Sequence, residues 1–231
     1  MSKIEHRFNE QYELVEMLSK SIAADLKDAI REKGKATLLV SGGSTPKPLF
    51  KRLSEMTLEW ENVTVGLCDE RWLPVSDESS NENLVTTHLL QGKAANATFV
   101  GMYVEETDIE SAEHLCDKKL RERLLPFDVI VLGMGSDAHT ASLFPNNVKL
   151  DKAFDLKREA LCIAIEPQTA PYMRMSLTRH AILSAARIYL HFEGNEKIAV
   201  YKEVKAGDDM FAMPIRAILN QDIKDVEVYY I

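Results

Sequence analysis

Short apolar runs alternate with longer amphipathic segments along most of this chain, and this alternation limits its fold more than any other feature. The apolar runs, which are typical of buried strands, cover residues 37–40, 63–67, 127–133, 160–165, 175–177, 187–192 and 226–230. Helical periodicity occurs at residues 10–33, 46–56, 81–90, 109–125 and 196–204. Strands that alternate with helices build parallel sheets. We therefore expect a doubly wound α/β fold, with a mainly parallel sheet flanked by helices on both faces.

The length and the cysteine content limit how the chain is organised. Residues 1–231 contain no internal repeat, linker or low-complexity tract and are expected to form one domain. Cys68, Cys116 and Cys162 include no C-x-x-C pair, so neither a disulfide framework nor a zinc ribbon is expected. No two histidines have the short spacing of a helical metal-binding pair. We expect neither a metal nor a cofactor.

The charge balance argues against one class of partner. The formal net charge is −8, whereas nucleic-acid surfaces depend on clustered Lys and Arg. No run approaches the ~18 apolar residues that a membrane span requires, and the first residues, MSKIEHRFNEQ, lack the apolar stretch of a signal peptide. We expect a cytoplasmic protein, either a monomer or a small homo-oligomer, that binds a small molecule and neither nucleic acid nor membrane.

Four loops follow predicted strands and are the first places to look for function. They are SGGSTP (41–46), DERW (69–72), GMGSDAHTASLFP (133–145) and GNEK (194–197). In an open α/β sheet, ligands bind beyond the carboxyl ends of the strands, where such loops and the N-termini of helices meet. These loops are therefore the candidates for a ligand site.

The first of these loops has the composition of an anion site. Gly42 and Gly43 permit close approach of the backbone to a ligand, and the hydroxyl groups of Ser44 and Thr45 can bind phosphate oxygens. Free N–H groups at the start of the following helix also favour an anion. A plain turn in which Ser44 or Thr45 caps the helix would use the same residues. The loop alone leaves both interpretations open.

Two further loops bring charged side chains to the same edge of the sheet. Arg71 can bind a phosphate through two parallel hydrogen bonds, although a structural ion pair with Asp69 or its neighbour also explains the DER sequence. Lys197 follows Gly194 and is expected in the first turn of a helix, where it is a candidate second cation for a phosphate. Most lysines are simply solvated, which is the alternative for Lys197.

His139 is the candidate general base, because it is the one histidine placed directly in a loop after a predicted strand. An unperturbed imidazole titrates near pH ~6.5, so it can take up and return a proton at neutral pH. Asp137 and Asp69 are the candidates to orient the ring by accepting its other N–H. The remaining histidines are interpreted as structural residues: His6, His88, His114, His180 and His191.

Two other interpretations of these loops fit less well. GMGSDA matches the loose G-x-G-x-x-[GA] dinucleotide fingerprint, but that fingerprint normally leads into a long helix, whereas Pro145 soon interrupts this segment. Neither Ser44 nor Ser136 is framed as G-x-S-x-G, so a serine hydrolase of the nucleophile-elbow type is not expected.

The order of the motifs is more specific than any one of them. SGGSTP, DERW with Ser80 and Asn81 beyond it, GMGSDAHTASLFP, RMSLT and GNEK together resemble the 6-phosphogluconolactonase family. The resemblance extends from about Leu38 to about Pro214. It implies a doubly wound fold shared with glucosamine-6-phosphate isomerases. In the isomerase branch the segment typically continues with Asn-Glu-Pro, so SLFP in this chain favours the lactonase branch.

The resemblance also implies roles for the site residues. The substrate phosphate would lie near Ser44 and Thr45, and His139 would be the base. The cations that bind the phosphate would be Arg71, Lys197 and, from RMSLT, Arg174.

One residue departs from the family pattern. Relatives usually have Asp-Gly-His where this chain has Asp137, Ala138 and His139. If the glycine were needed for a positive φ angle, alanine would be strained by roughly 1 kcal/mol. We expect an ordinary backbone angle at Ala138, with glycine merely usual in the relatives.

The activity implied by the resemblance is hydrolysis of 6-phospho-D-glucono-1,5-lactone to 6-phosphogluconate in the pentose phosphate pathway. His139 would activate the attacking water. One alternative is an amino-sugar-phosphate isomerase or deaminase with Asp69 as its base. The other is a non-enzymatic sugar-phosphate sensor, which would require a DNA-binding segment, and the acidic chain shows no basic arm for one.

Overall fold

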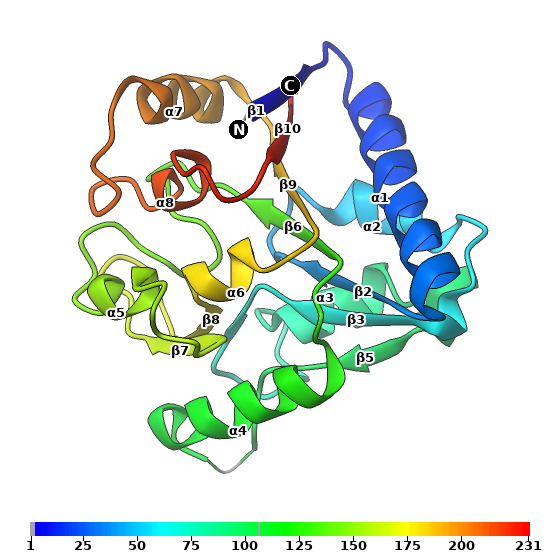
Figure 1. The fold of residues 1–231 in the computed structure, drawn as a ribbon, viewed down its shortest axis with the longest axis horizontal. Helices are drawn as coiled ribbons and strands as arrows, with labels where there is room; N and C mark the ends of the chain where they lie inside the picture. Colours follow the sequence, from blue (N-terminus) through cyan, green and yellow to red (C-terminus); the bar gives the residue numbers. More distant parts are fainter. Residues whose placement is uncertain (1–2, 106) are drawn as a thin grey trace.

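The protein is described by a computed structural model that covers residues 3–105 and 107–231 (Figure 1). Its central sheet has seven strands in the order β1-β10-β9-β6-β2-β3-β5, and all neighbouring strands are parallel. These strands are β1 (Lys3–Arg7), β2 (Ala36–Val40), β3 (Val63–Leu67), β5 (Thr98–Val100), β6 (Val129–Gly133), β9 (Arg187–Phe192) and β10 (Val226–Tyr230). The predicted mainly parallel sheet is confirmed.

The connections between strands run in two directions along the sheet. Those that lead toward β5 contain α1 (Gln11–Lys33), α2 (Lys47–Ser54) and α3 (Asn81–His88). Those that return toward β1 contain α4 (Ile109–Arg123), α5 (Leu150–Phe154), α6 (Arg179–Leu183) and α7 (Asn195–Ala206). Because crossovers between parallel strands are right-handed, the two sets of helices cover opposite faces; Figure 1 shows α1 and α2 to the right of the strands and α6 and α7 to the left. The direction changes between the neighbouring strands β2 and β6.

A second, smaller sheet differs from the expectation of a single parallel one. Its strands β4 (Asp69–Arg71), β8 (Arg174–Leu177) and β7 (Cys162–Ile165) are antiparallel. DERW is therefore mostly strand, not the predicted loop. The chain changes sheets at Cys68, whose N–H donates to the Val40 carbonyl at 2.9 Å while its carbonyl accepts from the Leu177 N–H at 2.8 Å.

Helix α1 illustrates why the long amphipathic segments were predictable. Its buried residues recur at three- and four-residue spacings: Leu14, Val15, Leu18, Ser19, Ile22, Ala23, Leu26, Ala29 and Ile30. Gly34, with a φ angle of 73°, ends the helix as expected and donates its N–H to the Ile30 carbonyl. Within the described residues, no helix is both long and apolar enough to cross a membrane.

The elements missing from the prediction are short or polar. Strand β5 has three residues and α8 (Arg216–Leu219) has four, too few to show a period. Strand β1 has the sequence KIEHR and lies at the edge of the sheet, beside β10 alone. An edge strand can carry charged residues because one side of it has no neighbouring strand.

Candidate active site

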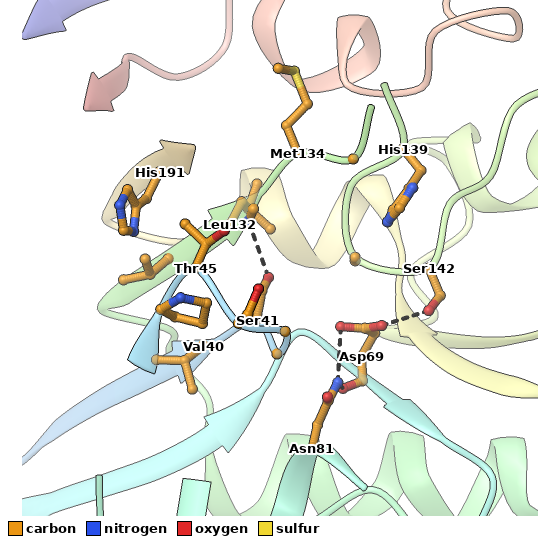
Figure 2. Close-up of a pocket in the computed structure, with 18 of the residues that line it drawn as sticks. Val40, Ser41, Thr45, Asp69, Asn81, Leu132, Met134, His139, Ser142 and His191 are labelled. Carbon is orange, nitrogen blue, oxygen red and sulfur yellow. Dashed lines mark hydrogen bonds between the residues drawn. The ribbon is translucent and has the colours of Figure 1, made fainter. Parts of the chain in front are cut away.

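A cavity of about 300 Å³ opens at the carboxyl ends of β2 and β6. Val40 and Ser41 line it from the end of β2, and the segment from Leu132 to Gly135 lines it from the end of β6 (Figure 2). The connections leaving these two neighbouring strands run in opposite directions, which leaves a crevice between them. The topology of the sheet therefore places the cavity where ligands bind in folds of this class.

All four segments predicted as loops from the sequence reach this cavity, although one of them, DERW, is mostly strand. The predicted site residues that line it are Gly42, Gly43, Ser44, Thr45, Asp69, Arg71, His139, Arg174 and Lys197. Asp137 is not among the lining residues, but it contacts His139 directly. Residues that are far apart in the sequence are thus brought together around one cavity.

His139 and Asp137 form a close pair. The Nδ1 atom of His139 lies 2.5 Å from Oδ1 of Asp137, which also accepts the His139 backbone N–H at 3.0 Å. Burial is the largest single effect and raises the pKa of Asp137, but the hydrogen bond with His139, the charge of His139 and backbone hydrogen bonds together hold the pKa below its ordinary value. An ionised carboxylate only accepts hydrogen bonds, so Nδ1 carries the proton and Nε2 is left as a proton acceptor.

The loop itself fixes the position of the His139 ring. The ring packs against Phe144, with a centroid distance of 4.7 Å, and lies so close to Gly135 that a Cβ atom there would be 2.2 Å from Nδ1. Ala138 has a φ angle of 66°, so the expectation of an ordinary backbone angle at this residue was wrong. The angle arises in a tight turn, in which the Ala138 N–H donates to the Gly135 carbonyl at 3.0 Å.

Asp69 has other partners and forms no hydrogen bond with His139 in the described structure. Its Oδ2 accepts the hydroxyl of Ser142 at 2.6 Å, and the side-chain amide of Asn81 donates to its carbonyl oxygen at 2.8 Å and to Oδ1 at 3.5 Å. Figure 2 shows Asp69 between Asn81 and Ser142. Of the two carboxylates proposed to orient the imidazole, Asp137 is the one in contact with it.

Two arginines lie side by side, and neither forms an ion pair with a carboxylate among the residues that the structure describes. Arg71 on β4 is paired in register with Arg174 on β8. Burial, and then the charge of Arg71, lower the pKa of Arg174. The Nε atoms of both are buried and have no hydrogen-bond partner among the residues that the structure describes. Like charges directly opposite each other are destabilising, so this arrangement favours an anion that contacts both guanidinium groups.

The alternative in which Arg71 belongs to a structural ion pair is not supported by its contacts. Its side chain donates through Nη1 to the Ser79 carbonyl, and no carboxylate pairs with it in the described part of the chain. The carboxylate of its neighbour Glu70 binds backbone instead, accepting the N–H groups of Arg71 and Asn81 at 2.7 Å and of Glu82 at 2.8 Å. Burial raises the pKa of Glu70 to about 7, against the opposing effect of these backbone hydrogen bonds.

The SGGST loop leaves its hydroxyl groups unused by the following helix. Residue Pro46 occupies the N-cap position of α2, and no side chain caps this helix, so the alternative in which Ser44 or Thr45 is the cap was wrong. Gly43 has a φ angle of 97°, and Gly42 lies against Asn81, whose Oδ1 would be 1.9 Å from a Cβ atom at residue 42. Both glycines are thus required by the backbone path.

Lys197 completes the lining of charged residues. It lies in the first turn of α7, after Gly194 at a φ angle of 100°. Burial lowers the pKa of Lys197, against the opposing charges of Glu193 and Glu196. The Lys197 side chain is half-buried and lines the cavity, which favours the candidate cation over a merely solvated lysine.

Several lining residues were not singled out as site residues from the sequence, namely Ser41, Asn81, Ser142 and His191. His191 was interpreted only as a structural residue, yet it faces the cavity beside Thr45, on the opposite side of Ser41 from His139 (Figure 2). Its place near the carboxyl end of β9 was the signal that could have identified it. Within the described residues, no three His, Cys, Asp or Glu side chains are grouped so that they could hold a metal ion.

The chain is similar to known proteins over nearly its whole length. A family model described as glucosamine-6-phosphate isomerases/6-phosphogluconolactonase matches residues 9–228. A 6-phosphogluconolactonase of Pseudomonas aeruginosa is 44% identical over 203 residues, which cover 87% of this chain and 85% of the relative. One of Rhizobium meliloti is 38% identical over 230 residues, which cover 100% of this chain and 99% of the relative.

Comparison with solved structures agrees with the sequence comparison. The crystal structure of a 6-phosphogluconolactonase from Shewanella baltica has a TM-score of 0.95 and 42% sequence identity, and the match covers 99% of this chain and 97% of that chain. The resemblance found in the motifs is therefore confirmed. This chain belongs to the family of glucosamine-6-phosphate isomerases and 6-phosphogluconolactonases.

Proposed function

We propose that this protein hydrolyses 6-phospho-D-glucono-1,5-lactone to 6-phosphogluconate, a step of the pentose phosphate pathway. Its similarity to several proteins named 6-phosphogluconolactonase supports this assignment. One structural observation carries the proposal. The same cavity is lined by His139, which Asp137 binds, and by Arg71 and Arg174, which form no ion pair among the described residues. A base and an anion site in one cavity fit a substrate with a phosphate and a reactive carbonyl.

The proposed base is the Nε2 atom of His139. Because Asp137 accepts the proton of Nδ1, Nε2 can take a proton from a water molecule whose oxygen attacks the C1 carbonyl of the lactone. The bond between C1 and the ring oxygen then breaks, and the imidazolium returns its proton to that oxygen. Water is consumed, the acid and its new hydroxyl group are formed, and the histidine is restored. Asp137 stabilises the imidazolium while it is charged.

The substrate phosphate is proposed to bind the cations and the SGGST loop. Arg71, Arg174 and Lys197 supply positive charge, and the N-terminus of α2 supplies N–H groups that no side chain caps. The Ser44 and Thr45 hydroxyls lie in the same loop. Binding energy from the phosphate, which does not react, fixes the carbonyl in front of the base.

The contacts of Asp69 do not favour the isomerase or deaminase alternative. In that mechanism Asp69 would act as the base, but its Oδ2 accepts a hydrogen bond from Ser142 at 2.6 Å, and Asn81 also binds this residue. The carboxylate thus connects β4, the His139 loop and α3.

The test is a pH-stat assay on freshly generated lactone, corrected for spontaneous hydrolysis, with wild-type protein and His139→Asn. We expect kcat to fall by ~10²- to 10⁴-fold in the variant while KM changes little. His88→Asn, at the end of α3 and outside the cavity, is the matched control. A kcat for His139→Asn close to that of the wild type would refute the assignment of the base, and ammonia release from glucosamine 6-phosphate would favour the deaminase alternative.

A further inference from the structure

Lys197 lines the cavity close to two acidic residues yet forms no ion pair with them. Glu193 precedes α7 and Glu196 lies in its first turn, and the charges of both act on the Lys197 ammonium group. Neither lies within ion-pair distance of it in the described structure, whereas His191 does pair with Glu193. A half-buried lysine beside a carboxylate would normally form an ion pair, so the lack of one at Lys197 requires an explanation.

Two hydrogen bonds hold the carboxylate of Glu193 in another direction. Oε1 lies 3.0 Å from Nε2 of His191, and Oε2 accepts the side-chain amide of Gln11 at 2.6 Å. Burial is the largest single effect and raises the pKa of Glu193, but these two hydrogen bonds and the charges of His191 and Lys197 together lower it overall. The carboxylate is therefore ionised, and its acceptor sites are directed toward β9 and the start of α1.

His191 is held firmly enough to fix the Glu193 carboxylate. It is 3% exposed and lies on β9, the middle of three neighbouring strands. In the register of the sheet it is opposite Gly133 on β6 and Tyr229 on β10, so both neighbouring strands support it. An ionised carboxylate only accepts hydrogen bonds, so the proton of the contact belongs to Nε2 of His191. Gln11 approaches from the first turn of α1, on a different connection of the sheet.

We propose that His191 and Gln11 are positioning residues that hold Glu193 away from Lys197 and so keep the lysine ammonium group available to the phosphate of the substrate. Glu193 is close enough for its charge to favour the protonated lysine, but it does not neutralise that lysine through a direct contact. The identity of the phosphate rests on the proposed function. The availability of the cation does not, because it applies to any phosphate that enters the cavity.

The test compares His191→Phe and Gln11→Leu with the same substitutions combined with Glu193→Gln. In His191→Phe the freed Oε1 of Glu193 is expected to pair with Lys197, raising KM for the lactone and the Kd for inorganic phosphate by about 10-fold, the loss of one hydrogen bond to a charged group. We expect kcat to stay within about twofold, because the base is at the other side of the cavity. Adding Glu193→Gln should restore KM and Kd, since a neutral amide does not compete for the ammonium group.

A second variant and a matched control make the test decisive. Gln11 is exposed, so Gln11→Leu tests the same prediction without disturbing the core, and a smaller rise in KM and Kd is expected. His6→Phe is the matched control, because it breaks a similar pair, His6 with Glu227 at 3.1 Å, outside the residues that line the cavity. Thermal unfolding shows which variants are folded.

The outcomes separate this proposal from the proposed function. If His191→Phe weakens phosphate binding and Glu193→Gln does not restore it, His191 binds phosphate or supports the fold directly, and the proposal is wrong. Unchanged Kd values in both single variants would also overturn it. Calorimetric binding of inorganic phosphate needs no turnover, so this result stands even if the wild-type protein fails to hydrolyse the lactone.

Discussion

His139 and Arg174 line the same cavity, but the protein positions them in different ways. Every contact described for the His139 ring comes from its own loop: Asp137 binds it, Phe144 packs against it and Gly135 leaves room for it. Arg174 is placed opposite Arg71 by the pairing of two strands that are far apart in the sequence. A single loop thus positions the base, whereas the anion site depends on the pairing of strands that are far apart in the sequence.

The difference also appears in the energetics of the two regions. The Nδ1 atom and the backbone N–H of His139 both bind Asp137, so this pair can be stable without a ligand. The Arg71–Arg174 pair brings like charges together and leaves two buried Nε atoms without partners, which costs stability in the free protein. A substitution that adds atoms beside the His139 ring is therefore expected to lower activity. Removing one arginine of the pair is expected to lower activity but to raise stability.

The local character of the base predicts a large effect from one methyl group. In Gly135→Ala the new Cβ atom would lie 2.2 Å from Nδ1 of His139 and 2.7 Å from Oδ1 of Asp137, so the pair must move. A displacement of about 1 Å costs ~10²-fold, and we expect kcat to fall by that amount. Gly133→Ala is the control, because its Cβ atom would meet nothing closer than 4.0 Å. Equal kcat values for the two variants would show that the loop does not fix the ring.

The second prediction concerns Glu70, which belongs to the region built by distant segments. Its pKa is raised to about 7 in the folded protein. At a pH between the pKa values of the unfolded and folded states, Glu70 is therefore protonated in the native state and ionised in the unfolded state. Stability is therefore lost as the pH rises through this window. From pH 5 to pH 6.5 we expect the free energy of unfolding to fall by about 1.5–2 kcal/mol more in the wild type than in Glu70→Gln. Urea unfolding at the two pH values measures this difference, and identical pH slopes would contradict it.

The third prediction tests the cost of the arginine pair. In Arg174→Met the repulsion with Arg71 disappears, so we expect the free energy of unfolding to rise by about 0.5–1 kcal/mol. The same change removes a proposed phosphate contact, and kcat/KM should fall by about 10-fold, mainly through KM. Kinetics and urea unfolding of the same preparation measure both effects. A loss of both stability and activity would mean that Arg174 is primarily a structural residue.

The same contrast explains what the sequence could and could not predict. The elements with a strong period, such as α1, and the charged or glycine-rich loops after strands were identified because their signals are local. The antiparallel sheet that sets Arg71 against Arg174 depends on register between distant strands, which no local pattern contains. The role proposed for His191 depends on its hydrogen bond with Glu193 and on the approach of Gln11 from a distant segment, which no local pattern reveals.

The smallest expected effect lies at the residue that departs from the family pattern. Ala138 has a φ angle of 66° and is completely buried. Replacing it with glycine should relieve about 1 kcal/mol of backbone strain but lose about 0.8 kcal/mol from the buried methyl group, so the net change in the free energy of unfolding should stay within about 0.5 kcal/mol. Ala181→Gly provides the comparison, because this buried alanine lies in helix α6, where glycine relieves no strain and a loss of about 1.5 kcal/mol or more is expected. If Ala138→Gly were as destabilising as Ala181→Gly, the buried methyl group would dominate, and the alanine would be a stabilising part of the loop that holds His139.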